Sequence, residues 1–195
     1  MSASLDHASL ARLFHDARSR NGWKAETLPD SVWRELYDLV KMAPTSMNTS
    51  PARFVFVTTE AGKARLKPHL MESNHKALAA PCVAIIAQDT AFYDRLPELF
   101  PARPQARDMF AGNPALSEIT AFRNSTLQGG YLILAARALG LDCGPMSGFN
   151  NASLDEEFFA GTTLKSNFVC ALGHGADESF PRLPRLSFET ACSIV

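Results

Sequence analysis

Apolar residues recur at helical spacing in three stretches of the first half of the chain. The first stretch predicts an amphipathic helix over residues 9–18 that ends near Asn21-Gly22. The second begins at Pro29 and is stopped by Pro44, and its apolar face consists of Val32, Leu36, Leu39, Val40 and Ala43. The third, over residues 62–71, is charged and is disturbed by Pro68.

The longest predicted helix follows Asn113-Pro114, a cap residue and a first-turn proline, and runs to Gly140. Its second half, residues 127–139, is apolar nearly all the way round and is interrupted chiefly by Gln128 and Arg137. More than one face of this helix must therefore be covered by protein. In a chain of this size, a second subunit is a natural cover.

Apolar runs predict four short strands, over residues 53–59, 82–88, 141–147 and 167–172. A helix with a capping box at Ser153 and Glu156 separates the last two strands. Residues 90–113 combine prolines and glycines with aromatics and arginines, which predicts an irregular excursion with short helical turns. The tail, residues 179–195, is too poor in periodic pattern for a helix, and we expect it to extend along a surface.

Composition indicates one domain over residues 1–195, because 46% of the residues are apolar and the length suits a single core. Nineteen basic residues against twenty acidic ones argue against nucleic-acid or membrane-surface partners. Residues 1–20 have neither the apolar core of a signal peptide nor a membrane span, so we expect a cytoplasmic protein. The four cysteines are widely spaced, which predicts buried free thiols and no metal site.

Several common chemistries are excluded because their sequence motifs are missing or incomplete. Glu178 stands where the third glycine of a dinucleotide fingerprint belongs, and no phosphate-binding loop or H-E-x-x-H sequence occurs. Residues 144–148 miss the G-x-S-x-G nucleophile elbow by one position, which argues against a serine hydrolase. His174 directly follows a strand and is expected to be a hydrogen-bonded structural residue.

Four separate segments combine small hydroxyl and amide residues with glycine, proline or arginine. They are residues 17–21, 43–51, 144–149 and 184–189. In order, spacing and content these segments resemble the nitroreductase family along nearly the whole chain. The family's basic-basic-Ser motif lies on Ala17-Arg18-Ser19, its Pro-Ser-x-x-Asn-x-x-Pro motif on residues 44–51, its Pro-x-x-Gly turn on residues 145–148, and its terminal arginine on Arg185.

The resemblance implies an α+β, nitroreductase-like fold: a central, mostly antiparallel sheet flanked by helices, in an intertwined homodimer with an exchanged C-terminal arm. It also implies FMN at the dimer interface and NADPH or NADH as hydride donor. Arginine is the best side chain for a phosphate, so Arg18 and Arg185 are the expected phosphate ligands, with Ser19 as a neutral donor. Asn21, Ser46 and Asn48 suit the ribityl hydroxyls.

Other cofactor contacts follow from the same resemblance. Lys76 is placed at the N1 and O2 edge of the flavin, where a cation stabilises the reduced anion. The turn of Pro145, Met146, Ser147 and Gly148 would present backbone groups to N5, and Pro44 and Thr45 complete the interface segment. Ala17 and Asn21 replace basic residues that are common in the family, and Arg20 or Arg182 can compensate for the lost charge. Without such compensation we expect weaker flavin binding.

Within the family, phrases such as Ala-Phe-Arg-Asn-Ser look like the subgroup assigned as malonic semialdehyde reductase of uracil (pyrimidine) degradation. Reduction of this substrate to 3-hydroxypropionate calls for an arginine near its carboxylate, and Arg107, Arg103 and Arg123 are the candidates, Arg107 foremost. No catalytic side chain is expected, because the hydride chemistry belongs to the flavin. A broad-specificity nitroarene or quinone reductase and a flavin-binding protein without turnover are the alternatives.

Overall fold

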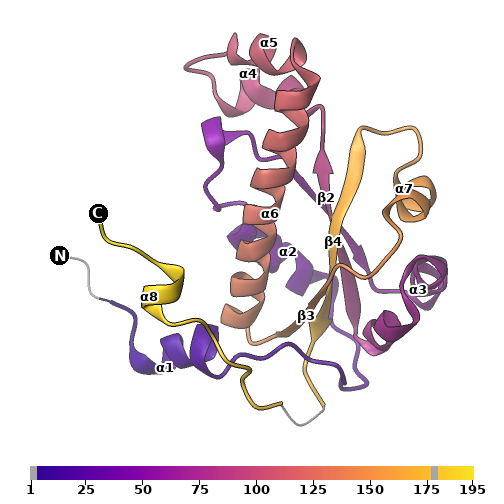
Figure 1. Cartoon of the computed structure of the whole chain (residues 1–195). Helices are drawn as coiled ribbons and strands as arrows, with labels where there is room; N and C mark the ends of the chain where they lie inside the picture. The colour runs from indigo at the N-terminus through magenta and orange to yellow at the C-terminus, as the bar shows by residue number, and fades with distance from the viewer. Residues whose placement is uncertain (1–3, 177–179) are drawn as a thin grey trace.

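The computed structural model describes residues 4–176 and 180–195 and shows a central sheet between two helical layers (Figure 1). The sheet has the order β1-β2-β4-β3, and all three pairings are antiparallel. Its strands are β1 (Ala52–Val57), β2 (Cys82–Asp89), β4 (Leu164–Gly173) and β3 (Asp142–Met146). The predicted α+β fold with an antiparallel sheet is therefore confirmed, and β1 and β3 are the two edge strands.

One face of the sheet is covered by α2 (Asp30–Val40) and α6 (Pro114–Ala138) (Figure 1). Trp33, Leu36 and Val40 of α2 are buried against it, and the Trp33 ring stacks on Phe56 of β1 with centroids 5.7 Å apart. Leu39, predicted on the same apolar face, is exposed because α2 turns that side away from the sheet. The apolar periodicity of α2 was otherwise a sound guide.

The other face is covered by α3 (Glu60–Leu66), the 3-10 helices Lys67–His69 and Glu72–Ala79, and α7 (Asn151–Phe159). Successive residues of β2 face opposite layers, and the strand is buried on both faces from Cys82 to Gln88. The excursion after β2 forms a 3-10 helix (Phe92–Arg95), α4 (Leu96–Leu99) and α5 (Ala106–Ala111) around a small apolar cluster. The predicted excursion with short helical turns is confirmed.

The long helix α6 has the predicted ends. The Asn113 side chain accepts a hydrogen bond from the backbone N–H of Leu116 at 3.0 Å, and Pro114 is the first helical residue. Gly140 follows the helix with φ of 92°, a left-handed value that glycine adopts easily. Gly129, inside α6, packs closely against β4. A Cβ at this position would be only 2.5 Å from the Phe168 ring.

Helix boundaries near the termini differ from the prediction. The first helix is α1 (His7–Leu10) continued by a π-helical turn (Ala11–His15), and it ends before residue 18. It ends there because the Arg182 guanidinium donates to the carbonyl oxygens of Phe14 and His15, both at 2.7 Å. The tail, predicted to lack helix, contains one short turn, α8 (Phe188–Ala191), and is otherwise extended and exposed.

Two smaller predictions are corrected. The cap of α7 is Asn150, whose side chain accepts from the Ser153 N–H at 3.0 Å, and the Ser153 hydroxyl contacts His69 instead of capping. Of the four cysteines, Cys192 is exposed in the tail, whereas the other three are buried free thiols.

In the described part of the chain, no helix is long and apolar enough to cross a membrane.

Candidate functional site

The segment with Arg18 and Ser19 runs beside the edge strand β3. Ser19 forms a parallel β-bridge with Cys143, and the Arg20 N–H donates to the Cys143 carbonyl at 3.0 Å. Asn21 follows in the same segment and is half-buried. Two of the four motif segments, residues 17–21 and 144–149, are therefore brought together at one edge of the sheet.

The turn at the end of β3 is tied to the 3-10 helix that carries Lys76. The Gly148 carbonyl accepts from the Met71 N–H at 3.0 Å and from the Asn74 side chain at 2.8 Å. A Cβ on Gly148 would lie 2.4 Å from Asn74 Nδ2, so a larger residue here would have to displace the Asn74 amide. Lys76 is exposed two residues further along, and it therefore shares this region with the turn.

Arginines gather where the tail meets the first helix. The Arg18 guanidinium donates to the His15 and Ala17 carbonyls at 2.9 Å and to the Phe180 carbonyl at 3.3 Å, and Arg182 donates to the end of the same helix. Desolvation lowers the pKa of Arg182, and the positive charges of neighbouring arginines lower it further; these are Arg18, Arg185 and Arg137. Mutually repelling guanidinium groups form a donor set that suits a phosphate dianion.

Arg20 and Arg182 differ in the charge that they leave available. Arg20 forms an ion pair with Asp142 at 3.3 Å, so its charge is largely compensated within the chain. Arg182 belongs to the arginine cluster, where neighbouring charges disfavour its protonated form. Of the two residues expected to replace the missing basic groups, Arg182 is the better placed. Arg185 lies further along the exposed tail, where its guanidinium donates to the carbonyls of Leu183 and Pro184 and its charge acts on Arg182.

The third motif segment, residues 44–51, has a strained backbone. Met47, Asn48 and Ser50 have φ values of 52°, 53° and 40°. Such left-handed conformations cost non-glycine residues roughly 1–3 kcal/mol each and concentrate at functional sites. We refer to residues 45–50 as the left-handed loop.

Contacts around the left-handed loop fix its shape. The Ser50 N–H donates to the Thr45 hydroxyl at 3.1 Å, and the Asn48 side chain donates to the Leu99 carbonyl at 2.8 Å. The Ser46 N–H donates to Asn124 Oδ1 of α6 at 2.8 Å. Pro44 and Ser46 remain exposed, so the loop has an accessible surface.

The left-handed loop and the β3 turn lie at opposite edges of the sheet within one chain. The loop leads into β1, whereas residues 18–21 and 145–148 lie on or beside β3, with β2 and β4 in between (Figure 1). Three strand spacings of about 4.8 Å separate the two edges. The predicted cofactor residues therefore form two groups in one subunit, and Arg185 in the tail is linked to the group of Arg18 through its charge interaction with Arg182.

The three arginines predicted to bind substrate have different surroundings. Arg107 is engaged with Asp94 at 2.8 Å and with Asp108 at 3.4 Å, and its pKa is raised by the hydrogen bond to Asp94. Arg103 is exposed in the turn between α4 and α5. Arg123 is exposed on α6, one residue before Asn124, which contacts the left-handed loop. Of the three arginines, Arg123 is therefore the one whose neighbour in the sequence contacts a predicted cofactor segment, the left-handed loop.

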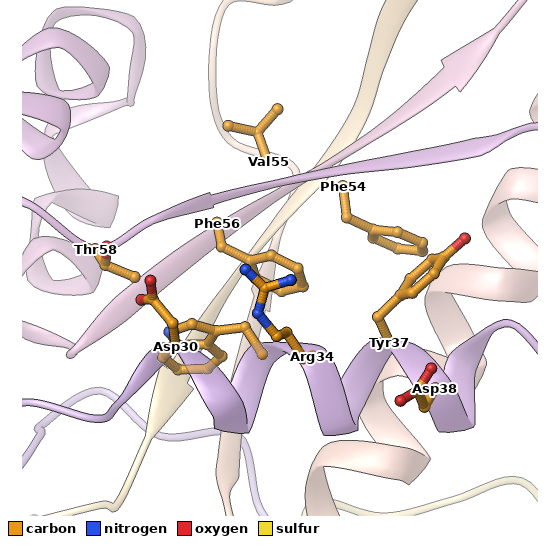
Figure 2. Close-up of a pocket in the computed structure, with 9 residues that line it drawn as sticks. Asp30, Arg34, Tyr37, Asp38, Phe54, Val55, Phe56 and Thr58 are labelled. Atoms are coloured by element: carbon orange, nitrogen blue, oxygen red, sulfur yellow. The ribbon is translucent and has the colours of Figure 1, made fainter.

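A cavity of about 760 Å³ opens between α2 and the edge strand β1 (Figure 2). Tyr37, Phe54 and Phe56 point into it together with Arg34, and none of the predicted cofactor residues lines it (Figure 2). A second cavity, of about 610 Å³, continues along β1 and includes Asn48. Tyr37, Phe54 and Phe56 line both cavities, so the aromatic cavity leads along the sheet edge toward Asn48 of the left-handed loop.

Three amide residues that hold the motif segments in place were not predicted as parts of the site: Asn74, Asn124 and Gln128. Gln128 and Asn124 are amides on the buried side of α6, and Gln128 was visible in the sequence as an interruption of an apolar pattern. A buried polar residue in such a helix has to satisfy its hydrogen bonds, which is the signal that could have found both amides. His174 behaves as predicted, with Nδ1 2.7 Å from Glu26.

The fold is that of solved nitroreductase-like structures. One, described as a "putative nitroreductase in complex with FMN" from Exiguobacterium sibiricum, has a TM-score of 0.86 and 20% identity, with 100% of this chain and 99% of that chain covered. Another, an enone reductase of gut-bacterial fatty acid saturation, has a TM-score of 0.83 and 20% identity, covering 98% of this chain and 100% of the other. At these identities the similarity concerns the fold.

Sequence comparison identifies the family. The model of the Nitroreductase family matches residues 17–175, and the chain belongs to this family. A relative from Cupriavidus pinatubonensis, named "Putative NADH dehydrogenase/NAD(P)H nitroreductase", is 58% identical over 189 residues, covering 95% of this chain and 96% of that protein. A relative of the same description from Ralstonia pickettii is 57% identical, covering 95% of this chain and 97% of that protein.

Proposed function

We propose that this protein is an FMN-dependent NAD(P)H oxidoreductase that works as a homodimer. The observation that carries the proposal is the division of the motif residues between two edges of one sheet, within a chain of the nitroreductase family. The strained loop at one edge, and at the other edge the β3 turn together with the arginines near the first helix, would be two halves of a site. A second subunit can bring one half of each chain to the other half of its partner.

The residues present fit FMN. Arg18, Arg182 and Arg185 supply cationic donors for the phosphate, and Ser19 adds a neutral one. Asn21, with Ser46 and Asn48 of the partner's loop, offers amide and hydroxyl groups for the ribityl chain. The remaining contacts would come from Pro44, Thr45, Lys76, Pro145, Met146, Ser147 and Gly148. The absence of a side chain at Gly148 lets the Asn74 side chain pack directly on this turn.

Bound FMN would supply the hydride-transfer chemistry between a reduced nicotinamide and the substrate. The task of the chain is to bind and orient the reactants. Lys76 places a positive charge beside the turn and would stabilise negative charge there. The Gly148 peptide is held by the Met71 N–H and the Asn74 side chain, which keeps the turn rigid. The arginine cluster anchors the phosphate end.

The proposed dimer is supported by uncovered apolar surface. On α6, four large apolar side chains are exposed: Ile119, Phe122, Leu127 and Tyr131. In the tail, Leu183 is 76% exposed and Ile194 is 88% exposed, which is unusual for such side chains in a monomer. The aromatic cavity along β1 is a suitable seat for the tail of a partner subunit, and β1 has a free edge for strand pairing (Figure 2).

For the substrate we propose malonic semialdehyde, reduced to 3-hydroxypropionate, on the basis of the subgroup resemblance. Arg123 is the favoured partner of the substrate carboxylate, because Arg107 is already paired with two carboxylates. The second candidate function is the reduction of nitroarenes or quinones. The names of the relatives, which include NAD(P)H nitroreductase, favour this second candidate.

The test is an absorption spectrum of the purified protein with and without added FMN, followed by anaerobic titration with NADPH and then with malonic semialdehyde. Bleaching by NADPH and recovery with the aldehyde support both cofactor and substrate. Recovery only with nitroarenes or quinones selects the second candidate. A protein that does not bind FMN refutes the proposed function, and sedimentation as a monomer refutes the dimer.

A further inference from the structure

Two buried amide side chains of α6 hold the ends of the left-handed loop. Asn124 is 5% exposed and Gln128 is 4% exposed, and their spacing of four residues puts them on one face of the helix. Asn124 Oδ1 accepts from the Ser46 N–H at 2.8 Å. Gln128 Oε1 accepts from the Ala52 N–H at 2.9 Å, just beyond the other end of the loop.

All three left-handed residues lie between these two anchors. Non-glycine residues keep such conformations only where the surrounding structure holds them. The internal contact between Ser50 and Thr45 closes the loop on itself, but it does not fix the loop to the rest of the molecule. The two amides of α6, together with the bond from Asn48 to Leu99, provide that attachment.

A neighbouring buried hydroxyl on the same helix does not share this role. Ser125 lies between them in sequence and is fully buried. Its hydroxyl donates to the Phe122 carbonyl at 3.1 Å and accepts from the Asn167 side chain at 3.0 Å. Ser125 therefore satisfies its hydrogen bonds within α6 and toward β4, and none of its hydrogen bonds reaches the loop.

We propose that Asn124 and Gln128 are positioning residues that hold Ser46 and Asn48 in the conformation that receives FMN. The proposal rests on the proposed function, because it assigns the left-handed loop to the cofactor site. Neither amide needs to touch FMN. Each raises the fraction of molecules whose loop is ready to bind, and the apparent affinity scales with that fraction.

The test compares FMN affinity among variants with and without the two acceptors. Asn124→Leu and Gln128→Met keep side-chain volume and remove the acceptor. Ser125→Ala is the matched control, since it removes an equally buried hydrogen bond that does not reach the loop. Kd is measured by quenching of flavin fluorescence, and amide hydrogen exchange of residues 44–52 is followed in the apoprotein.

We expect Asn124→Leu and Gln128→Met each to weaken FMN binding by about 3- to 10-fold, the usual value of one hydrogen bond. The double variant should bind FMN more weakly than either single variant, because both ends of the loop then lose their anchors. Exchange within residues 44–52 should be faster in these variants. Ser125→Ala should bind FMN within about threefold of the wild type.

An unchanged Kd in the double variant overturns the proposal, and so does faster exchange without loss of affinity, because the loop would then not belong to the cofactor site. If Asn124→Leu or Gln128→Met does not fold, Gln128→Asn serves as the test variant. The shorter Asn side chain withdraws the acceptor from the Ala52 N–H. The two levels of inference fail differently. A wild-type protein that does not bind FMN refutes the proposed function, whereas a wild type that binds with variants that bind equally well refutes only the positioning role.

Discussion

Two adjacent glycines of α6 allow the packing of the long helix on the sheet to be measured. We expect Gly129→Ala to destabilise the protein relative to Gly130→Ala. A Cβ on Gly129 would lie 2.5 Å from Cε1 and Cζ of Phe168, whereas a Cβ on Gly130 has no atom within 4 Å in the described chain. Both glycines stand inside the same helix, so the two substitutions differ chiefly in this contact.

The magnitude follows from two opposing effects. Replacing glycine by alanine in a helix interior stabilises by about 0.8–1 kcal/mol, and this gain applies equally to both positions. Overpacking against a buried ring costs about 1–3 kcal/mol, because the Phe168 side chain has to shift within a filled core. The difference between the two variants should therefore be about 1–3 kcal/mol in the free energy of unfolding, with Gly130→Ala the more stable.

The assay is urea unfolding followed by circular dichroism at two widely separated protein concentrations. Association makes the midpoint depend on concentration, so the comparison separates packing inside the chain from an effect on the proposed dimer. Equal stability of the two variants at both concentrations would show that α6 does not approach β4 at Gly129, and would refute the reasoning. A concentration-dependent loss confined to Gly130→Ala would place the partner subunit against the exposed face of α6.

Three further outcomes are expected. Arg123→Ala should raise the apparent KM for malonic semialdehyde by about 10-fold or more, as for a lost charged hydrogen bond, while Arg107→Ala leaves it unchanged; equal effects would contradict the assignment. Desolvation acts to raise the pKa of Glu26, but the hydrogen bonds from His174 outweigh it and lower this pKa below its ordinary value of 4.5. Glu26→Gln should therefore lose no more than about 1 kcal/mol of stability above this pH. The difference should disappear as the pH falls through the lowered pKa. A difference that grows in acid would be inconsistent with the pairing of Glu26 and His174. Gly148→Ala should displace the amide that now bonds its carbonyl, costing about 1 kcal/mol and slowing FMN reduction by NADPH in stopped-flow measurements; an unchanged rate would remove this turn from the proposed hydride site.

Elements whose signals are local were predicted well from the sequence. The four strands and the helices α2 and α6 have continuous apolar runs or regular apolar faces, and Asn113 and Pro114 mark the start of α6 within two residues. The grouping of Ser19 with the β3 turn was also expected, but only through resemblance to a family. Local pattern alone does not pair a segment near residue 19 with a strand near residue 143.

Features that depend on distant partners could not be predicted. The first helix ends where Arg182 takes its carbonyls, from a position 168 residues beyond Phe14 in the chain. The left-handed conformations of Met47 and Ser50 run against the preference of those residue types, and the amides that hold the loop lie on α6. The exposure of Cys192 depends on where the tail lies, which the sparse apolar pattern of that segment leaves open.

The separation of the motif residues onto two edges of the sheet has a genetic consequence. If each complete site draws the arginine cluster from one chain and the left-handed loop from the other, two differently damaged chains can rescue one another. A dimer of an Arg18→Ala chain with an Asn48→Ala chain would contain one site with both defects and one site with neither. Coexpression of the two inactive alleles should then restore growth or turnover that neither allele supports alone, which is intragenic complementation between halves of a shared site.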